Sequence, residues 1–379
     1  MKRVLFITGT RADFGKLKSL ISVVKNSSDF DYTIFCTGMH LLKKYGNTMS
    51  EIFKSGFNNV FPYINQVESD GMEMVLANTI QGLSRYIDEY DADLIVIHGD
   101  RVEALAGAIA GALKNKRVAH VEGGEITGTI DELIRHATSK MSHVHFVASN
   151  DARNRLLQLG ETGDSIFQIG SPDIDVMLSD HLPDLSDCKK KYQINFNEYA
   201  IAIFHPVTNE EVSLQRKHAK IYVDSLLRSG LNYVVIYPNN DLGSEFIFEE
   251  IRRLSDDHRF KIFPSIRFEY FLTILKKAQF IIGNSSVGMH EAPVYGVPTV
   301  NLGSRQKNRF HYESIVHPDF NKGAIIDAIA QLRDKNFDGT YHYGDGKSSE
   351  KFLNALRTTS FWDIKMDKQL VDIFNKQFS

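Results

Sequence analysis

The feature that most constrains the fold of this chain is an alternation of short apolar runs with amphipathic helical segments, which occurs in two blocks. In the first block we predict strands at Val4–Thr8, Asp31–Cys36, Leu94–His98, Val118–Glu122, Val144–Ala148 and Ile166–Ile169. After a polar stretch, Asp173–Asn197, the second block has predicted strands at Ala200–Phe204, Tyr233–Tyr237, Lys261–Phe263, Phe280–Gly283 and Thr299–Leu302. Strands that alternate with helices are typical of βαβ units and parallel sheets. The sequence therefore predicts an α/β protein with two Rossmann-like domains facing each other across a cleft.

We place the first domain at residues 1–172 and the second at 173–355, and we expect a helical tail, 356–379, to pack back on the first domain. The 379 residues suffice for two ordinary domains. A net charge of −3 provides no bulk field that favours nucleic acid or an anionic membrane. Two cysteines, an N-terminal apolar run too short for a signal peptide, and the lack of a long apolar run predict a cytoplasmic protein.

Three acidic residues between Leu94 and His136 lie at the ends of predicted strands or at the start of a predicted helix. Asp100 follows one predicted strand, Glu122 ends the next, and Asp131 opens a predicted helix, Asp131–Ser142. Ligands of open α/β sheets bind at the carboxyl ends of the strands. Carboxylates gathered there indicate proton-transfer chemistry on a bound small molecule. The alternative for Asp131 is a structural role as the N-cap of its helix.

A glycine-containing turn, Gly9–Lys16, joins the first predicted strand to a helix. Free backbone N–H groups at a helix N-terminus bind anions, so we expect Arg11, with help from Lys16, to contact a diphosphate. The turn is not a nucleotide-hydrolase P-loop, because five residues separate Gly9 from Gly15 and Leu17 replaces the magnesium-binding Ser or Thr. A tight turn with a solvated arginine is the alternative reading.

A second glycine-containing turn, Gly283–Pro293, follows a predicted buried strand. The hydroxyls of Ser285 and Ser286 and the backbone N–H groups are suited to a diphosphate, although serines also cap helices without any ligand. Gly288 allows close backbone approach, and Glu291, one helical turn further on, is placed to accept both ribose hydroxyls. Arg305 follows the next predicted strand. These residues predict a nucleotide site in the second domain.

Two further candidates follow strands of the second domain. His205 precedes Pro206 at a strand end and is a candidate phosphate donor or acid, or a structural histidine. Arg267 is a candidate partner of a phosphate or a base, or an exposed surface residue. The spacing of Cys, His, Asp and Glu shows no metal motif, so we predict neither a metal nor a cofactor.

Seven motifs, spread over residues 1 to about 330, resemble those of one enzyme family in their sequences and in their order along the chain. The motifs are GTRADFGKL, HGDRVEALAGA, HVEGGEITGTIDELIRH, FHPVT, YPNND, GNSSVGMHEAPVYGVP and LGSRQKNR. Together they resemble the hydrolysing UDP-N-acetylglucosamine 2-epimerases of sialic acid synthesis, and the epimerase half of the bifunctional animal enzyme. The resemblance implies a GT-B-like pair of Rossmann domains, elimination of UDP to give a 2-acetamidoglucal, and hydration to N-acetylmannosamine.

The resemblance also implies roles for individual residues. It assigns the catalytic acids to Asp100, Glu122 and Asp131, and leaves open which of them removes the proton from C2. It assigns the nucleotide contacts to Arg11, His205, Arg267, Ser285, Ser286, Gly288, Glu291 and Arg305, with Arg101 nearby. It further implies a homo-oligomer, a dimer or a tetramer, with a UDP-sugar as substrate.

Three other functions fit parts of the same pattern. A hydrolysing epimerase for UDP-2,4-diacetamido-2,4,6-trideoxyglucose, used for legionaminic acid, would share every motif, because that sugar differs only at C4 and C6. A GT-B glycosyltransferase would bind UDP-sugar in the same way but needs a single base and an acceptor. A nucleotide-sugar sensor would not need the three acids together.

Overall fold

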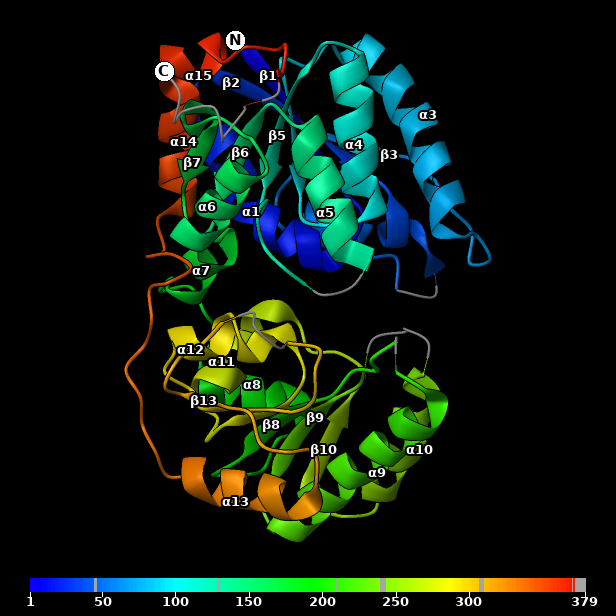
Figure 1. Cartoon of the computed structure of the whole chain (residues 1–379), viewed down its shortest axis with the longest axis vertical. Coiled ribbons are helices and arrows are strands. Elements are labelled where there is room, and N and C mark those ends of the chain that lie inside the picture. The colour runs from blue at the N-terminus through cyan, green and yellow to red at the C-terminus, as the bar shows by residue number, and fades with distance from the viewer. Residues whose placement is uncertain are drawn as a thin grey trace, which may run out of the picture. The chain divides into compact units, whose positions relative to one another are not determined.

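The computed structural model describes residues 1–43, 46–127, 130–208, 210–238, 243–306, 310–369 and 371. The chain divides into two compact units, Met1–Leu178 with His342–Ser379, and Ser179–Tyr341. The boundaries predicted from the sequence, after residues 172 and 355, remain predictions about separately folding domains. Figure 1 shows helices on both faces of each sheet.

Within the described residues, the first unit has a seven-stranded parallel sheet of order β3-β2-β1-β4-β5-β6-β7. Its strands are β1 (Lys2–Thr8), β2 (Phe30–Cys36), β3 (Val60–Pro62), β4 (Leu94–His98), β5 (Arg117–Val121), β6 (Val144–Val147) and β7 (Ile166–Gln168). The six strands predicted for the first block are confirmed, with ends shifted by one or two residues. The edge strand β3 was not predicted, and Glu122 lies just beyond β5 rather than within it.

The helices of the first unit lie in two layers. One layer contains α3 (Met72–Tyr90), α4 (Val102–Leu113) and α5 (Ile130–Met141), which pack in that order. The other contains α1 (Arg11–Lys25), α7 (Pro172–Met177) and α14 (Ser348–Arg357), which contact one another. The remaining helices are η1 (Gly38–Leu41), α2 (Met49–Lys54), α6 (Asn150–Gln158), η3 (Gly163–Ser165) and α15 (Thr359–Asp363).

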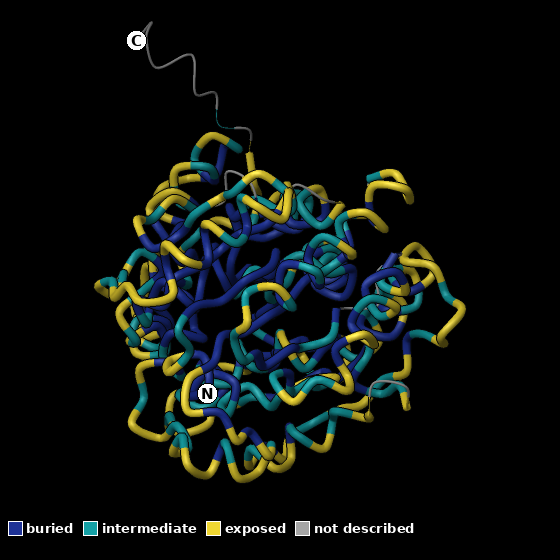
Figure 2. The backbone as a smooth tube through the Cα atoms, turned by 90° about the horizontal axis from the view of Figure 1, so that it is seen from below, coloured by how far each residue is buried: buried dark blue, intermediate teal, exposed yellow. Residues whose placement is uncertain are grey.

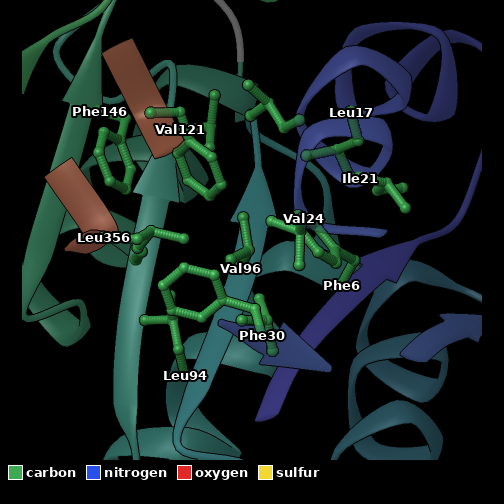
Figure 3. Packing of buried hydrophobic residues seen from close by; sticks show 14 of the residues in the cluster. Phe6, Leu17, Ile21, Val24, Phe30, Leu94, Val96, Val121, Phe146 and Leu356 are labelled. Atoms are coloured by element: carbon green, nitrogen blue, oxygen red, sulfur yellow. The ribbon is translucent and has the colours of Figure 1, made fainter. Parts of the chain in front are cut away.

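Strand residues of the first unit are apolar on both faces because helices cover both. Successive side chains of a strand point to opposite faces. Val4 and Phe6 accordingly join the core beside α1, while Leu5 and Ile7 join the core beneath α3 and α4. Figure 3 shows Phe6 near Leu17, Ile21 and Val24 of α1 in the first of these cores.

The C-terminal segment belongs to the first unit. Phe352 of α14 packs on Phe146, with ring centroids 4.7 Å apart. Arg117 at the start of β5 donates hydrogen bonds to two backbone carbonyls beyond α14, those of Trp362 at 2.7 Å and Ile364 at 2.9 Å. These contacts, far apart in sequence, attach the tail to the sheet.

Within the described residues, the second unit has a six-stranded parallel sheet of order β10-β9-β8-β11-β12-β13. Its strands are β8 (Ala200–Ile203), β9 (Tyr233–Ile236), β10 (Phe260–Phe263), β11 (Ile281–Gly283), β12 (Thr299–Asn301) and β13 (Ile315–Val316). Its helices are α8 (Leu185–Tyr192), α9 (Val212–Ser229), α10 (Ser244–Ile251), η4 (Arg252–Leu254), α11 (Phe268–Lys276), η5 (Ser286–Gly288), α12 (Glu291–Val294) and α13 (Lys322–Leu332). The five predicted strands are confirmed, and β13 is an addition.

Each sheet has a switch point, where the chain reverses the direction in which it adds strands. The reversal lies between β1 and β4 in the first unit and between β8 and β11 in the second. Ligands of open α/β sheets bind at such points, beyond the carboxyl ends of the strands. Figure 2 shows the buried parts of the backbone in dark blue and the exposed parts in yellow. In the described part of the chain, no helix is both long enough and apolar enough to cross a bilayer.

Candidate functional site

Glu122, one of the three predicted acids, is buried and contacts several polar side chains. It follows β5 in the left-handed region, with φ of 63°, and is 7% exposed. Lys16 Nζ on α1 lies 2.9 and 3.1 Å from its two carboxylate oxygens. Ser171 Oγ donates to Oε1 at 2.6 Å, and His98 Nε2 at the end of β4 lies 3.1 Å from Oε2. The carboxylate is therefore surrounded by donors from three separate elements.

These donors decide the charge of Glu122. Burial raises the pKa of a carboxyl group, but the ammonium of Lys16, the imidazole of His98 and the hydroxyl of Ser171 outweigh burial here. They hold the pKa of Glu122 well below its usual range. Glu122 is thus a carboxylate near neutral pH.

Arg135 links Asp100 to Glu122. Its guanidinium, 3% exposed, forms an ion pair with Asp100 and donates to the backbone carbonyl of Glu122 at 2.7 Å. Asp131 lies four residues earlier on the same helix, so it and Arg135 lie on one face of α5. Asp131 is the second residue of α5, after Ile130, so the suggestion that it is the N-cap is wrong. The structure brings Asp100 and Glu122 together around Arg135, with Asp131 one turn away.

The predicted anion site at Gly9–Lys16 is filled by the protein itself. Asp13 accepts hydrogen bonds from the backbone N–H groups of Gly9 at 2.9 Å and Thr10 at 3.0 Å, and Thr10 in turn caps α1 by accepting from Asp13. The expectation that these N–H groups are free for a diphosphate is therefore wrong. Arg11 is the first residue of α1, whereas Lys16 is directed to Glu122.

Arg101 lies just before α4 and next to Asp100. Its Nε lies 3.2 Å from the buried carboxylate of Glu103. Burial lowers the pKa of the Arg101 guanidinium, but the carboxylates of Glu103, Asp13 and Asp100 outweigh it and raise the pKa. Arg101 is therefore a permanent cation in the turn between β4 and α4.

In the second unit, Asn284 joins three loops at the switch point. Its side chain accepts from the backbone N–H of His205 at 2.6 Å and donates to the His205 carbonyl at 2.8 Å. Its own carbonyl accepts from Arg305 at 3.4 Å and from Gln306 at 3.1 Å. The segments after β8, β11 and β12 are thereby fixed to one another, because the backbone of His205 and the side chain of Arg305 both bond to Asn284.

The Gly283–Pro293 turn is tightly built around its glycines. A Cβ on Gly283, which has φ of 140°, would lie 1.7 Å from the carbonyl oxygen of Ile203, and one on Gly288 would lie 2.6 Å from Thr299 Cγ2. Ser285 caps η5, and Ser286 is its first residue. Glu291, which is 8% exposed, is the first residue of α12. It was predicted to lie one helical turn after the serines, but Ser286 belongs to η5, which is a separate short helix.

Arg267 is set apart from this group. It precedes α11 after β10, at the opposite end of the strand order from β12. Its Nε pairs with Glu269 at 3.1 Å, and its backbone N–H donates to Tyr192 Oη at 3.1 Å. The second unit therefore gathers His205, Ser285, Ser286, Gly288, Glu291 and Arg305 around β8, β11 and β12, but not Arg267.

The sequence interpretation missed several residues that shape the site: His98, Arg135, Ser171 and Asn284, and the pairing of Lys16 with Glu122. Each of them follows a strand or lies within a quoted motif, which was the available signal. Residues 239–241 and 307–309 of the quoted motifs, and residues 128 and 129 before α5, lie outside the described residues. In the part of the chain that is described, no three His, Cys, Asp or Glu side chains converge as a metal site would require.

Comparison with known proteins identifies similar sequences. The sequence model described as UDP-N-acetylglucosamine 2-epimerase matches residues 22–357. The chain is 46% identical over 377 residues to a UDP-N-acetylglucosamine 2-epimerase of Neisseria meningitidis serogroup B, covering 98% of this chain and 100% of that protein. It is 31% identical over 363 residues to a UDP-N,N'-diacetylbacillosamine 2-epimerase (hydrolyzing) of Legionella pneumophila, covering 94% of this chain and 96% of that protein.

A solved structure agrees at the level of the fold. The crystal structure of a UDP-GlcNAc 2-epimerase from Neisseria meningitidis bound to UDP-GlcNAc has a TM-score of 0.78 and 19% identity, covering 93% of this chain and 99% of that one. This similarity confirms the predicted fold class of two Rossmann-like α/β units. Taken with the matched sequence model and the 46% identical relative, it shows that the chain belongs to the UDP-N-acetylglucosamine 2-epimerase family.

Proposed function

We propose that the protein is a hydrolysing 2-epimerase that converts UDP-N-acetylglucosamine and water to N-acetylmannosamine and UDP, the first step of sialic acid synthesis. The observation that carries the proposal is the cluster at the switch point of the first unit. There Glu122 is held as an anion by Lys16 while Arg135 joins it to Asp100. A base, a second acid and fixed cations are the groups that elimination followed by hydration requires.

In the first half of the reaction, Glu122 accepts the proton from C2 of the sugar. The electron pair of that C–H bond forms the C1=C2 double bond, and the pair of the C1–O bond leaves with UDP. The product in the site is a 2-acetamidoglucal. We assign this step to Glu122 because its carboxylate is buried among groups that keep it ionised, and a positioned base contributes about 10²–10⁴-fold in rate.

In the second half, water adds across the double bond. Its hydroxyl group joins C1, and a proton reaches C2 from the face opposite to that of the first proton, which inverts C2. Asp100 and Asp131 are the groups available to deliver that proton and to activate the water. Their placement around Arg135 supports this division of roles.

The second unit supplies the nucleotide contacts in this proposal. Ser285, Ser286 and the backbone around Gly288 bind the diphosphate, and the buried carboxylate of Glu291 accepts the ribose hydroxyls. Arg305 and His205, fixed by Asn284, stabilise the charge that develops on the departing UDP. Arg11, Arg101 and Arg267 are further candidate cations for the same anion.

One other substrate has specific support. The 31% identical Legionella relative is named for UDP-N,N'-diacetylbacillosamine, the 2,4-diacetamido sugar. We favour UDP-N-acetylglucosamine because the relative named for that sugar is 46% identical. Membership of the epimerase family argues against the glycosyltransferase and sensor alternatives.

Phosphorus NMR of the reaction with UDP-N-acetylglucosamine tests the hydrolysing mode. We expect the signals of the nucleotide sugar to be replaced by those of UDP alone, one equivalent for each equivalent consumed. A lasting mixture of two UDP-sugars, without free UDP, would contradict hydrolysis and indicate a non-hydrolysing epimerase.

A further inference from the structure

Asp173 is a buried acid that the proposed reaction does not use. It lies in the first turn of α7, is 1% exposed, and neither of its carboxylate oxygens has a hydrogen-bond donor among the described residues. Lys16 Nζ, 3.9 Å from Oδ2, is the cation recorded beside it. A buried carboxylate without hydrogen-bond donors destabilises the folded state. Its position next to Lys16 therefore calls for an explanation.

The same ammonium is bound to Glu122. Lys16 lies within 2.9–3.1 Å of both Glu122 oxygens, and Ser171 and His98 contact one oxygen each. A carboxylate oriented in this way has little room to accept a further proton. For Glu122 to act as the base for C2, at least one of these donors has to withdraw.

We propose that Asp173 is a positioning residue that receives Lys16 when substrate binds, and so frees a lone pair of Glu122 for the C2 proton. A shift of the flexible lysine side chain by about 1 Å would bring Nζ to hydrogen-bond distance of Asp173. The ion pair is exchanged rather than lost, because the cation moves from one buried carboxylate to another. No bond to carbon is made by Asp173 or Lys16 in this step.

The elements packed around Asp173 show why Lys16 is the cation placed to pair with it. On one side, α7 packs on α1, where Ser19 donates to the carbonyl of Pro172 at 3.4 Å. On the other side α14 contacts Asp175 instead, through the backbone N–H groups of Ser348 and Ser349, each at 2.7 Å. Asp175, two residues from Asp173 on the same helix, is thus a fully bonded structural acid and a matched control.

Steady-state kinetics with UDP-N-acetylglucosamine test this role in four variants: Asp173→Asn, Asp173→Glu, Asp175→Asn and Lys16→Met. We expect Asp173→Asn to lower kcat about 10- to 100-fold while KM changes less than about threefold. Asp173→Glu should recover much of the loss, and Asp175→Asn should retain kcat near that of the wild type. In the Lys16→Met background, adding Asp173→Asn should lower kcat by no more than about twofold, because the group that it receives is absent.

Additive effects of Lys16→Met and Asp173→Asn, or an unchanged kcat in Asp173→Asn, would overturn the proposal. If Asp173→Asn does not fold, a crystal structure of Asp100→Asn with bound UDP-N-acetylglucosamine decides instead. Lys16 Nζ should then be hydrogen-bonded to Asp173, and its retention on Glu122 would overturn the exchange. The inference rests on the proposed function, whose failure is separate: wild-type protein inert with both candidate UDP-sugars would overturn the function and this inference with it.

Discussion

Glu122 illustrates how one residue is prepared for proton transfer by the way parallel strands end. The left-handed backbone at Glu122 turns the chain directly after β5, and the carboxylate meets Lys16 from α1 and His98 from β4. Local propensity does not favour φ of 63° for glutamate. The ion pairs and the hydrogen bond from Arg135 to the Glu122 carbonyl hold the residue there. The strained conformation is thus compensated by the groups that also set its charge.

The three acids should be individually essential. We expect Asp100→Asn, Glu122→Gln and Asp131→Asn each to lower kcat by about 100-fold or more, since acid–base groups contribute about 10²–10⁴-fold. Because the acids act on the sugar, the Kd for UDP should change less than about threefold in each. Asp88→Asn, an exposed acid paired with Lys114, is the control. Near-full activity in any of the three would remove that residue from the mechanism.

Glu291 should act on the ribose. We expect Glu291→Ala to raise the Kd for UDP about tenfold, since hydrogen bonds to charged groups contribute about 1.5–3 kcal/mol. The wild type should bind 2'-deoxy-UDP more weakly than UDP, and the variant should bind both alike. Titration calorimetry measures all four affinities, with the exposed Glu249→Ala as control. An unchanged preference for the 2'-hydroxyl in the variant would refute the ribose contact.

At the scale of elements, helices bring together acids that the sequence separates. The helix α5 carries Asp131 and Arg135 on one face, so a single helix presents an acid and also anchors Asp100 and Glu122. This helix was predicted from the sequence as Asp131–Ser142, within one residue of its bounds. The short strands β3 and β13 were not, because two or three residues carry no periodicity and these strands exist only through pairing at the sheet edge.

The tail beyond α15 should be held chiefly by Lys368. Its Nζ donates to the carbonyls of Ser139 and Ser142 at the end of α5 and lies 2.6 Å from the buried carboxylate of Glu161. We expect Lys368→Met to reduce the stability of the first unit by about 1–2 kcal/mol, discounted for the partial exposure of the lysine. Faster proteolysis at the C-terminus, relative to Lys365→Met, is the measurement. Equal protection of the two variants would show that the tail is held by its other contacts.

At the scale of the whole molecule, pairing across long sequence distances limits what the sequence predicts. The two α/β units follow from local patterns and are confirmed, and Asp100 and Glu122 follow β4 and β5. Two contacts were not predicted: the hydrogen bonds from the backbone N–H groups of Gly9 and Thr10 to Asp13, and the ion pair of Lys16 with Glu122. Both depend on side-chain directions that are set only when the sheet has formed, and Lys16 and Glu122 are 106 residues apart.

We expect the folded protein to become less stable at acidic pH because Glu161 becomes protonated. Burial raises the pKa of this carboxyl group, but a hydrogen bond from His145 and the charges of Lys368 and Lys140 outweigh it and lower the pKa to about 2. Because the pKa is below the value of about 4.3 in an unfolded chain, the stabilisation is full above that pH and is lost as the pH falls towards 2. It amounts to about 3 kcal/mol.

Apparent melting temperatures of the wild type and Glu161→Gln between pH 6 and pH 3 test this dependence. The wild type should lose stability steeply below about pH 4.3, and the variant, less stable at pH 6, should show a shallower decline. Parallel curves for the two proteins would mean that Glu161 is not the group that titrates.

Proton NMR of the reaction in D2O tests most directly whether the protein hydrolyses its substrate with inversion at C2. With UDP-N-acetylglucosamine as substrate, we predict free N-acetylmannosamine that carries deuterium at C2, because the C2 proton is removed and replaced from solvent. UDP-N-acetylmannosamine as the product, or free N-acetylglucosamine that retains its C2 proton, would contradict the account.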